Sequence, residues 1–236
     1  MYLQRPKFEI MPHLAYEEML ALVCRAIHVF DKTQDPVTPV YREVTIKARL
    51  ENGIFSFGEC VGFSVVLTVD RGMAQEFSRH GIAHLIQENP LYCDYSKAIF
   101  GSQVSFIMPN AIRTIPYIIP EGPYEMAHDI FKGLALKNTE TKETRYVTDL
   151  GRIAWFLGLK EAEEKYLGAV KNGLELENAS GLLPSATKAE VVITANMREW
   201  GFIFETHIEN SEVRSIVSDI FISAKRLFPA FFSHID

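Results

Sequence analysis

Hydrophobic residues alternate with polar ones in some segments of the chain and recur every three or four positions in others, which predicts a mixture of strands and helices. The clearest strand is 60–70, CVGFSVVLTVD, because it is rich in β-branched residues. Shorter runs of the same kind predict strands at 103–108 and 190–194. Residues 1–11 alternate loosely, and this pattern predicts an edge strand.

Helical spacing of apolar residues is the second pattern. It predicts helices over 13–30, 72–79, 124–137, 147–172, 196–207 and 211–228. The segment 44–50 stays open between strand and helix, because its apolar residues alternate while its residue types also suit a helix. No internal repeat is visible. We therefore predict an α+β protein with one domain over 1–236 and a helical portion at about 122–182.

The net charge and the spacing of the cysteine and histidine residues exclude some classes of protein. The 236 residues include 24 Lys and Arg and 30 Asp and Glu, for a net charge of −6. This balance argues against binding of a nucleic acid polymer, which usually needs a basic surface. The three cysteines form no CxxC pair, and the histidines show no HExxH spacing. The sequence therefore predicts neither a structural zinc nor another metal site.

Localisation is a separate expectation. The first residues contain no apolar core of a signal peptide. No window reaches the ~18–20 apolar residues of a membrane span. The widely spaced cysteines fit a reducing compartment. We therefore expect a cytoplasmic protein that has no membrane partner.

Two polar clusters are candidates for chemistry. Arg79 and His80 end a short helix that follows the strand 60–70, and Glu76 lies one turn earlier. Both a binding site and an ordinary surface pair fit this pattern. Asn196 precedes the predicted helix 196–207 and is suited to cap its N-terminus. The apolar residues that follow are mostly core, with one ring left to stack on a planar ligand; they are Trp200, Phe202, Ile203 and Phe204.

A long segment then resembles a known family. Residues 79–92, RHGIAHLIQENPLY, are similar to the signature of flavin-dependent thymidylate synthases, which is roughly RHRxASxxQESxRY. The run CDYSK that follows matches its usual continuation CNYSK. Further segments match in the same order along the chain, at 56–59, 103–109, 164–173, 178–184 and 187–200. The resemblance covers roughly residues 14–235.

The resemblance implies a fold and an activity. The fold would be a central mixed sheet with flanking helices. Such enzymes are homotetramers that bind FAD across subunit interfaces. They methylate dUMP at C5, with a methylene group from methylenetetrahydrofolate and electrons from NADPH. The expected partners are therefore a pyrimidine nucleotide and further copies of the chain.

The resemblance also assigns site residues. Those expected to bind FAD are Ser56, Arg79, His80, Gln87, Asn196 and Arg198. Those expected to bind the nucleotide are Glu76, Arg79, Glu88 and Asn89. His207 stands where the family places an arginine beneath uracil N3, so that it is the candidate catalytic residue.

Several family residues are replaced. Ile54 and Gly81 stand for a histidine and an arginine, Asn89 for the phosphate-binding serine, and Leu91 and Ser180 for two arginines. A charged hydrogen bond contributes ~1.5–3 kcal/mol. Loss of both phosphate arginines therefore predicts dUMP binding that is weaker by about two to four decades.

A replacement cation for the phosphate would have to come from elsewhere. Lys97 and Arg71 are near in sequence, but the sequence does not place either of them. Three interpretations remain open. The chain is a divergent enzyme, or a non-catalytic paralogue that assembles with itself or with an active homologue, or a binding module for another planar ligand.

Overall fold

The computed structural model describes residues 1–31, 38–79, 84–113, 119–129, 132–206 and 211–235. The chain forms two compact units, each built from three separate segments. Unit 1 comprises Met1–Lys7, Thr68–Gln75 and Gln87–Glu190, and unit 2 comprises Phe8–Leu67, Glu76–Ile86 and Val191–Asp236. That residues 1–236 act as one domain stays a prediction.

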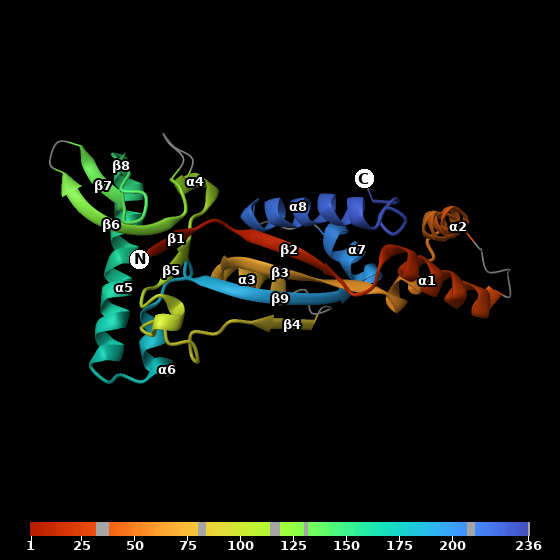
Figure 1. Cartoon of the computed structure of the whole chain (residues 1–236), viewed down its shortest axis with the longest axis horizontal. Helices are drawn as coiled ribbons and strands as arrows, with labels where there is room; N and C mark the ends of the chain where they lie inside the picture. The colour runs from red at the N-terminus through yellow and green to blue at the C-terminus, as the bar shows by residue number, and fades with distance from the viewer. Residues whose placement is uncertain (32–37, 80–83, 114–118, 130–131, 207–210, 236) are drawn as a thin grey trace. The chain divides into compact units, whose positions relative to one another are not determined.

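Unit 1 contains a five-stranded sheet (Figure 1). In spatial order the strands are β5 (Ser105–Ile107), β1 (Tyr2–Gln4), β6 (Gly122–Asp129), β7 (Gly133–Asn138) and β8 (Thr144–Val147). β1 is parallel to β5, whereas the β1–β6, β6–β7 and β7–β8 pairs are antiparallel. The sheet is therefore mixed, as the family resemblance predicts.

The helix α5 (Leu150–Lys171) packs against this sheet. Asp149 caps its N-terminus by accepting the Arg152 backbone N–H at 2.9 Å. Phe156 and Tyr166 of the helix share one apolar core with Leu134 and Leu136 of β7. The short helices of unit 1 are η2 (Ala98–Phe100), α4 (Asn110–Arg113), α6 (Leu176–Ala179) and η3 (Ser180–Leu182).

The predicted helix at 124–137 is wrong, and so is the helical portion from about 122. This segment supplies β6 and most of β7. In β7, Leu134 and Leu136 are buried while Lys137 is exposed, which is the two-residue period of a strand. The turn after β7 is fixed by Asn138, whose side-chain oxygen accepts the backbone N–H groups of Glu140 and Thr141.

Unit 2 is built around a four-stranded sheet with the order β2 (Lys7–Pro12), β3 (Gly62–Asp70), β9 (Lys188–Asn196), β4 (His84–Gln87). The edge strand predicted at 1–11 is thus two strands. β2 lies at the edge of its sheet, as predicted, whereas β1 lies between β5 and β6 in the five-stranded sheet. The ends Thr68–Asp70 of β3 and Lys188–Glu190 of β9 belong to unit 1.

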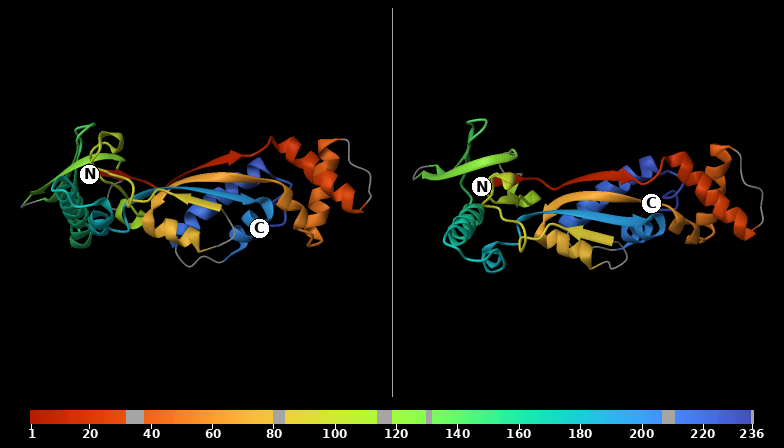
Figure 2. Two further views of the ribbon diagram at one scale, coloured as in Figure 1. Left: turned by 90° about the horizontal axis from the view of Figure 1, so that it is seen from below. Right: turned by 60° about the horizontal axis from the view of Figure 1, so that its bottom comes forward.

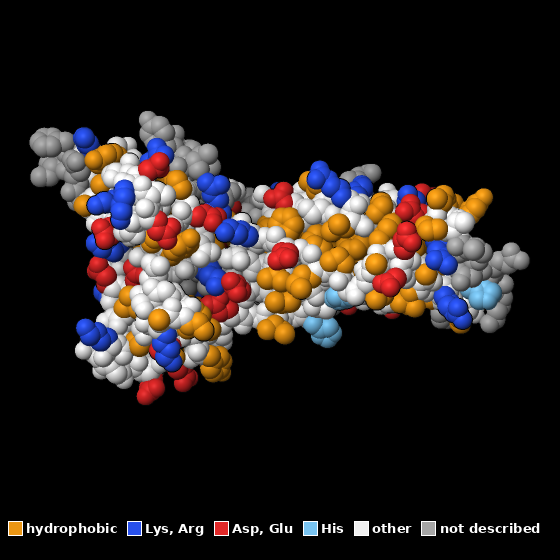
Figure 3. Space-filling view, in the orientation of Figure 1, with side chains coloured by type: hydrophobic (Ala, Val, Ile, Leu, Met, Phe, Trp, Pro, Cys, Tyr) orange, Lys and Arg blue, Asp and Glu red, His pale blue; other side chains and the backbone are white. Residues whose placement is uncertain are grey.

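The two faces of this sheet differ. Phe63, Val65 and Leu67 of β3 are buried, on the side where α7 (Met197–Glu205) and α8 (Ser211–Leu227) lie (Figure 2). Trp200 of α7 stacks on Phe63 with 4.7 Å between ring centroids and donates its indole N–H to the Phe63 carbonyl. On the opposite face the side chains are only half-buried, and Figure 3 shows hydrophobic groups over these strands.

Helices α1 (Tyr16–Asp31) and α2 (Pro39–Glu51) pack side by side in unit 2. The ambiguous segment 44–50 is therefore helical, because Ile46 and Leu50 recur four residues apart on the buried face. A short 3₁₀ helix, η1 (Ser56–Cys60), then leads into β3. The helix α3 (Arg71–Ser78) follows β3 directly, as predicted.

No helix in the described ranges is both long and apolar enough to cross a membrane. The predicted strands at 60–70, 103–108 and 190–194 correspond to β3, β5 and β9. The helices predicted at 13–30, 72–79, 147–172, 196–207 and 211–228 correspond to α1, α3, α5, α7 and α8, respectively. The α+β class is therefore confirmed.

Candidate functional site

Three of the residues expected to bind flavin, Ser56, Asn196 and Arg198, lie where η1 meets α7. Ser56 opens η1, and Arg198 lies in the first turn of α7, where its guanidinium forms an ion pair with Glu59 of η1. A Cβ on Gly58 would lie 3.2 Å from the Arg198 backbone nitrogen. Glycine therefore lets η1 approach the N-terminus of α7 this closely.

Asn196 caps α7, as its position in the sequence predicts. Its side-chain oxygen accepts the Glu199 backbone N–H at 2.8 Å, and the Glu199 carboxylate accepts the Asn196 N–H at 3.1 Å. This reciprocal pair is a capping box. Because the cap uses the amide oxygen, the NH₂ group of Asn196 remains the part that is suited to a ligand.

Two cavities border this junction. The aromatic cavity has a volume of about 210 Å³, and its wall includes Phe55, Arg198, Phe202, Glu205, Phe231 and His234. The Asn196 cavity has a volume of about 300 Å³, and its wall includes His13, Glu59, Cys60, His84, Thr194 and Asn196.

Phe202 and His234 give the aromatic cavity its chemistry. Phe202 is 56% exposed, whereas Trp200 and Ile203 beside it are buried, so that Phe202 is the ring left open for stacking. The Nδ1 atom of His234 is buried and has no hydrogen-bond partner among the described residues. Burial lowers the pKa of His234. The negative charge of Glu205, whose carboxylate oxygen lies 3.9 Å from His234 Nε2, offsets this only in part. His234 was not among the predicted site residues, because no motif in the neighbouring sequence marks it.

Arg79 and Glu76 lie at the end of α3. Their side chains form an ion pair at 3.3 Å, and Arg79 remains 70% exposed. Neither residue is in the wall of the aromatic cavity or of the Asn196 cavity. His80 and His207 lie outside the described residues, so their expected roles stay predictions.

Gln87 and Asn89 lie together in unit 1, in the wall of a cavity of about 520 Å³ that we call the amide cavity. The Asn89 side-chain oxygen accepts the Leu91 backbone N–H at 3.0 Å, so that its NH₂ group is the available donor. The wall of the amide cavity also includes Arg71, Gln75, Leu183 and Ser185.

The side chain of Glu88, which lies between Gln87 and Asn89 in the sequence, contacts other residues of the same chain. Its carboxylate accepts the Tyr95 hydroxyl at 3.1 Å and the Glu190 backbone N–H at 3.1 Å, and pairs with the Lys188 ammonium at 2.9 Å. The side chains of Lys188 and Glu88 are only 16% and 11% exposed. The placement gives Glu88 a structural role, and its expected contact with a nucleotide stays a prediction.

These groups change one another's acidity. Burial alone would lower the pKa of Lys188, but its hydrogen bonds and ion pairs with Glu88 and Glu190 outweigh burial and raise it. Burial and the Glu88 carboxylate raise the pKa of Tyr95 far above its usual value. At neutral pH, Lys188 is therefore charged and the Tyr95 hydroxyl is a donor.

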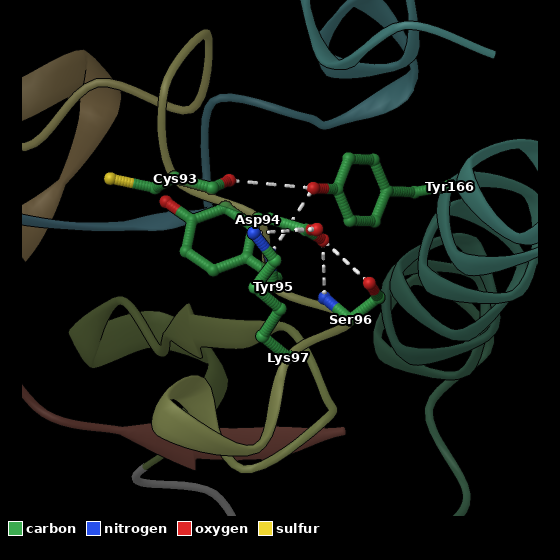
Figure 4. A network of polar contacts seen from close by, with 6 residues as sticks. All are labelled: Cys93, Asp94, Tyr95, Ser96, Lys97 and Tyr166. Carbon is green, nitrogen blue, oxygen red and sulfur yellow. Dashed lines mark hydrogen bonds and ion pairs between the residues drawn. The ribbon is translucent and has the colours of Figure 1, made fainter. Parts of the chain in front are cut away.

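The segment after Asn89 is held by a second set of polar contacts (Figure 4). The Tyr166 hydroxyl accepts the Tyr95 backbone N–H at 3.3 Å and donates to the Cys93 carbonyl at 3.4 Å. The Asp94 carboxylate accepts the Ser96 hydroxyl at 2.5 Å and pairs with Lys97 at 3.6 Å. These contacts fix the loop that leads away from the amide cavity.

The positions of the two missing phosphate arginines carry no charge. Leu91 is partly exposed, and Ser180 is buried with its hydroxyl donating to the Glu177 carbonyl at 2.8 Å. Of the two cations named as possible replacements, Lys97 pairs with Asp94, whereas Arg71 is in the wall of the amide cavity. Within the described part of the chain, no three His, Cys, Asp or Glu residues could hold a metal ion.

Known proteins support the resemblance in fold. The UMP/dUMP methylase PolB from Streptomyces cacaoi, in its crystal structure bound with 5-Br dUMP, matches with a TM-score of 0.66 and 14% sequence identity, over 99% of this chain and 97% of PolB. The structure of PolB bound with 5-Br UMP matches with a TM-score of 0.62 and 15% identity, over 98% and 95% of the two chains. No curated protein sequence matches this chain significantly.

The family model named thymidylate synthase complementing protein matches residues 14–230. This match covers nearly all of the segment over which the sequence resembles the flavin-dependent thymidylate synthases. The chain therefore belongs to the thymidylate synthase complementing protein family, that of the flavin-dependent thymidylate synthases.

Proposed function

We propose that this protein is a flavin-dependent methylase that acts at C5 of dUMP or a related pyrimidine nucleotide. The observation that carries the proposal is the amide cavity, where Gln87 and Asn89 of the signature-like segment lie with Arg71. Its volume of about 520 Å³ is in the ~300–1,000 Å³ range of small-molecule sites. PolB, which shares the fold, is a UMP/dUMP methylase, and this supports a nucleotide of the same class.

The side chains of the amide cavity suit such a nucleotide. An amide offers a donor and an acceptor side by side, as the imide edge of uracil does. Gln87 is therefore assigned to the base, in place of the FAD contact that the family resemblance implies. The NH₂ group of Asn89 and the hydroxyl of Ser185 add neutral donors to the same wall.

The junction of η1 and α7 is assigned to FAD. The hydroxyl of Ser56, the NH₂ group of Asn196 and the guanidinium of Arg198 are donors, which suit an anionic diphosphate and the oxygens of a flavin ring. The open ring of Phe202 and the orphaned Nδ1 of His234 fit a planar heteroaromatic group. FAD supplies the electron transfer from NADPH, and methylenetetrahydrofolate supplies the carbon.

The proposed assembly is a homotetramer, or a hetero-oligomer with an active homologue. The half-buried face of the four-stranded sheet and the highly exposed Arg79 support it, because both would gain contacts from another chain. Light scattering tests it: a mass near the 26.8 kDa of one chain contradicts the proposal.

The function is tested with the purified full chain. Its visible spectrum, before and after addition of FAD, reports a bound flavin. Incubation with FAD, NADPH, methylenetetrahydrofolate and either dUMP or UMP is followed by mass spectrometry of the nucleotide. The expected product carries one methyl group at C5, and an unchanged nucleotide despite bound FAD contradicts the proposal.

One observation favours a second interpretation, in which the protein is a non-catalytic paralogue. Leu91 and Ser180 supply no charge where the family has arginines, and the Ser180 hydroxyl is already used within the chain. The same experiment separates the two functions. A protein that binds neither FAD nor nucleotide, and that forms a stable oligomer, supports the paralogue.

A further inference from the structure

We propose that Arg71 binds the phosphate of the nucleotide in the amide cavity and so replaces the arginines missing at Leu91 and Ser180. This inference rests on the proposed function, because it concerns the same nucleotide. It adds a residue that determines the preference for a phosphorylated ligand.

The backbone holds Arg71 at the cavity. Arg71 is the first residue of α3, and its backbone N–H donates to the carbonyls of Ser185 at 2.9 Å and Thr187 at 3.0 Å. Asp70 caps the helix by accepting the Met73 N–H at 2.8 Å. The position of Arg71 therefore depends on main-chain bonds, which persist when the side chain is changed.

The local charge favours an anion. Arg71 is the one charged residue among the described residues of the cavity wall; the rest are neutral. The Arg71 guanidinium takes part in none of the ion pairs between described residues. The nearby Glu88 carboxylate is neutralised by Lys188 at 2.9 Å. Arg71 is half-buried as a residue, and a guanidinium without a carboxylate partner is suited to a phosphate, which it binds through two parallel hydrogen bonds.

Lys97, the other candidate cation for the phosphate, is already paired elsewhere. The Lys97 ammonium pairs with Asp94 at 3.6 Å, and Lys97 is not in the wall of the amide cavity. Neutral donors from Asn89 and Ser185 share the wall with Arg71. The amide cavity thus contains the chemistry that a phosphate needs: one cation and several neutral donors.

The test compares two ligands that differ only in the phosphate. Calorimetry measures binding of dUMP and of 2′-deoxyuridine to the wild type, Arg71→Ala and Arg71→Lys. We expect Arg71→Ala to weaken dUMP binding at least tenfold, about 1.4 kcal/mol, and to leave 2′-deoxyuridine binding unchanged. Arg71→Lys should restore part of the loss, because it keeps the charge without the planar fork. Lys97→Ala is the matched control and should change neither affinity.

The outcomes separate this inference from the function on which it rests. If Arg71→Ala binds dUMP as the wild type does, or loses both ligands equally, the inference is overturned while the proposed function stands. If the wild type binds neither ligand, both are overturned. A thermal unfolding curve of Arg71→Ala that matches the wild type shows that a loss of binding is not a loss of folding.

Discussion

The amide cavity of unit 1 and the η1–α7 junction of unit 2 both contain residues that match the family, but their surroundings differ. In unit 1, Glu88 and Lys188 form an ion pair whose side chains are 11% and 16% exposed. In unit 2, Glu59 and Arg198 form a pair whose side chains are 50% and 54% exposed. The first pair is part of the protein interior, and the second faces solvent.

The difference in exposure decides how firmly each region is held in place. A buried charge that loses its partner destabilises a protein by ~3–5 kcal/mol, whereas an exposed pair contributes ~0–1 kcal/mol. Gln87 and Asn89 are therefore held in place by buried neighbours of their own chain. Arg198 is held weakly, so that it can exchange Glu59 for a ligand. The predictions below test this contrast.

The largest effect is expected for Lys188→Met. The substitution leaves the Glu88 carboxylate buried without its cation, so that we expect a loss of about 3 kcal/mol in the free energy of unfolding. Urea unfolding measures it. The matched control is Lys165→Met, which removes the exposed pair with Glu161 and should leave the urea midpoint close to that of the wild type. Equal effects of the two variants contradict the contrast.

Tyr95→Phe is expected to have a smaller effect of the same origin. It removes the hydroxyl that donates to Glu88 at 3.1 Å but keeps the buried ring. A hydrogen bond to a charged group contributes ~1.5–3 kcal/mol, and the free energy of unfolding should fall by about that much. Tyr92→Phe is the control, because Tyr92 is exposed; an unfolding midpoint of Tyr95→Phe equal to that of the control rejects the role of the hydroxyl.

Arg198→Ala should barely change stability, by ~0–1 kcal/mol, because its ion pair with Glu59 is exposed. Under the proposed function it should nevertheless lower the amount of FAD that the purified protein retains. Absorbance of the flavin per chain is the measurement. Glu59→Ala keeps the guanidinium and serves as the control. Undiminished flavin in Arg198→Ala would remove this residue from the proposed FAD site.

The smallest expected effect concerns the stability of the protein at low pH. The hydrogen bond from the Ser96 hydroxyl, with smaller contributions from the Ser96 backbone N–H and the charge of Lys97, outweighs burial and holds the pKa of Asp94 below its ordinary 3.8. A depressed pKa contributes stability above the unfolded value, and this contribution is lost as the pH falls through the lower folded value. NMR titration should show the Asp94 midpoint rising in Ser96→Ala. A midpoint that stays unchanged would show that Ser96 is not the cause.

The sequence by itself determined the elements whose pattern is local. β3 follows from its β-branched run, and α1 and α5 follow from helical spacing, because the buried face of a long element repeats within that element. Asn196 was predicted as a cap because a cap needs only the next three residues. The signature-like segment identified the family, since its residue types at fixed spacing are carried by the chain alone.

The other strands and the grouping of the site residues depend on contacts between distant segments. The segment 124–137 is a strand pair, since β6 and β7 bury their side chains against α5, which is distant in sequence. β4 has four residues and depends on pairing in a sheet, so that no local pattern predicts it. Arg71 and Gln87 share a cavity, and Glu88 meets Lys188, because residues far apart along the chain come together only when the unit packs.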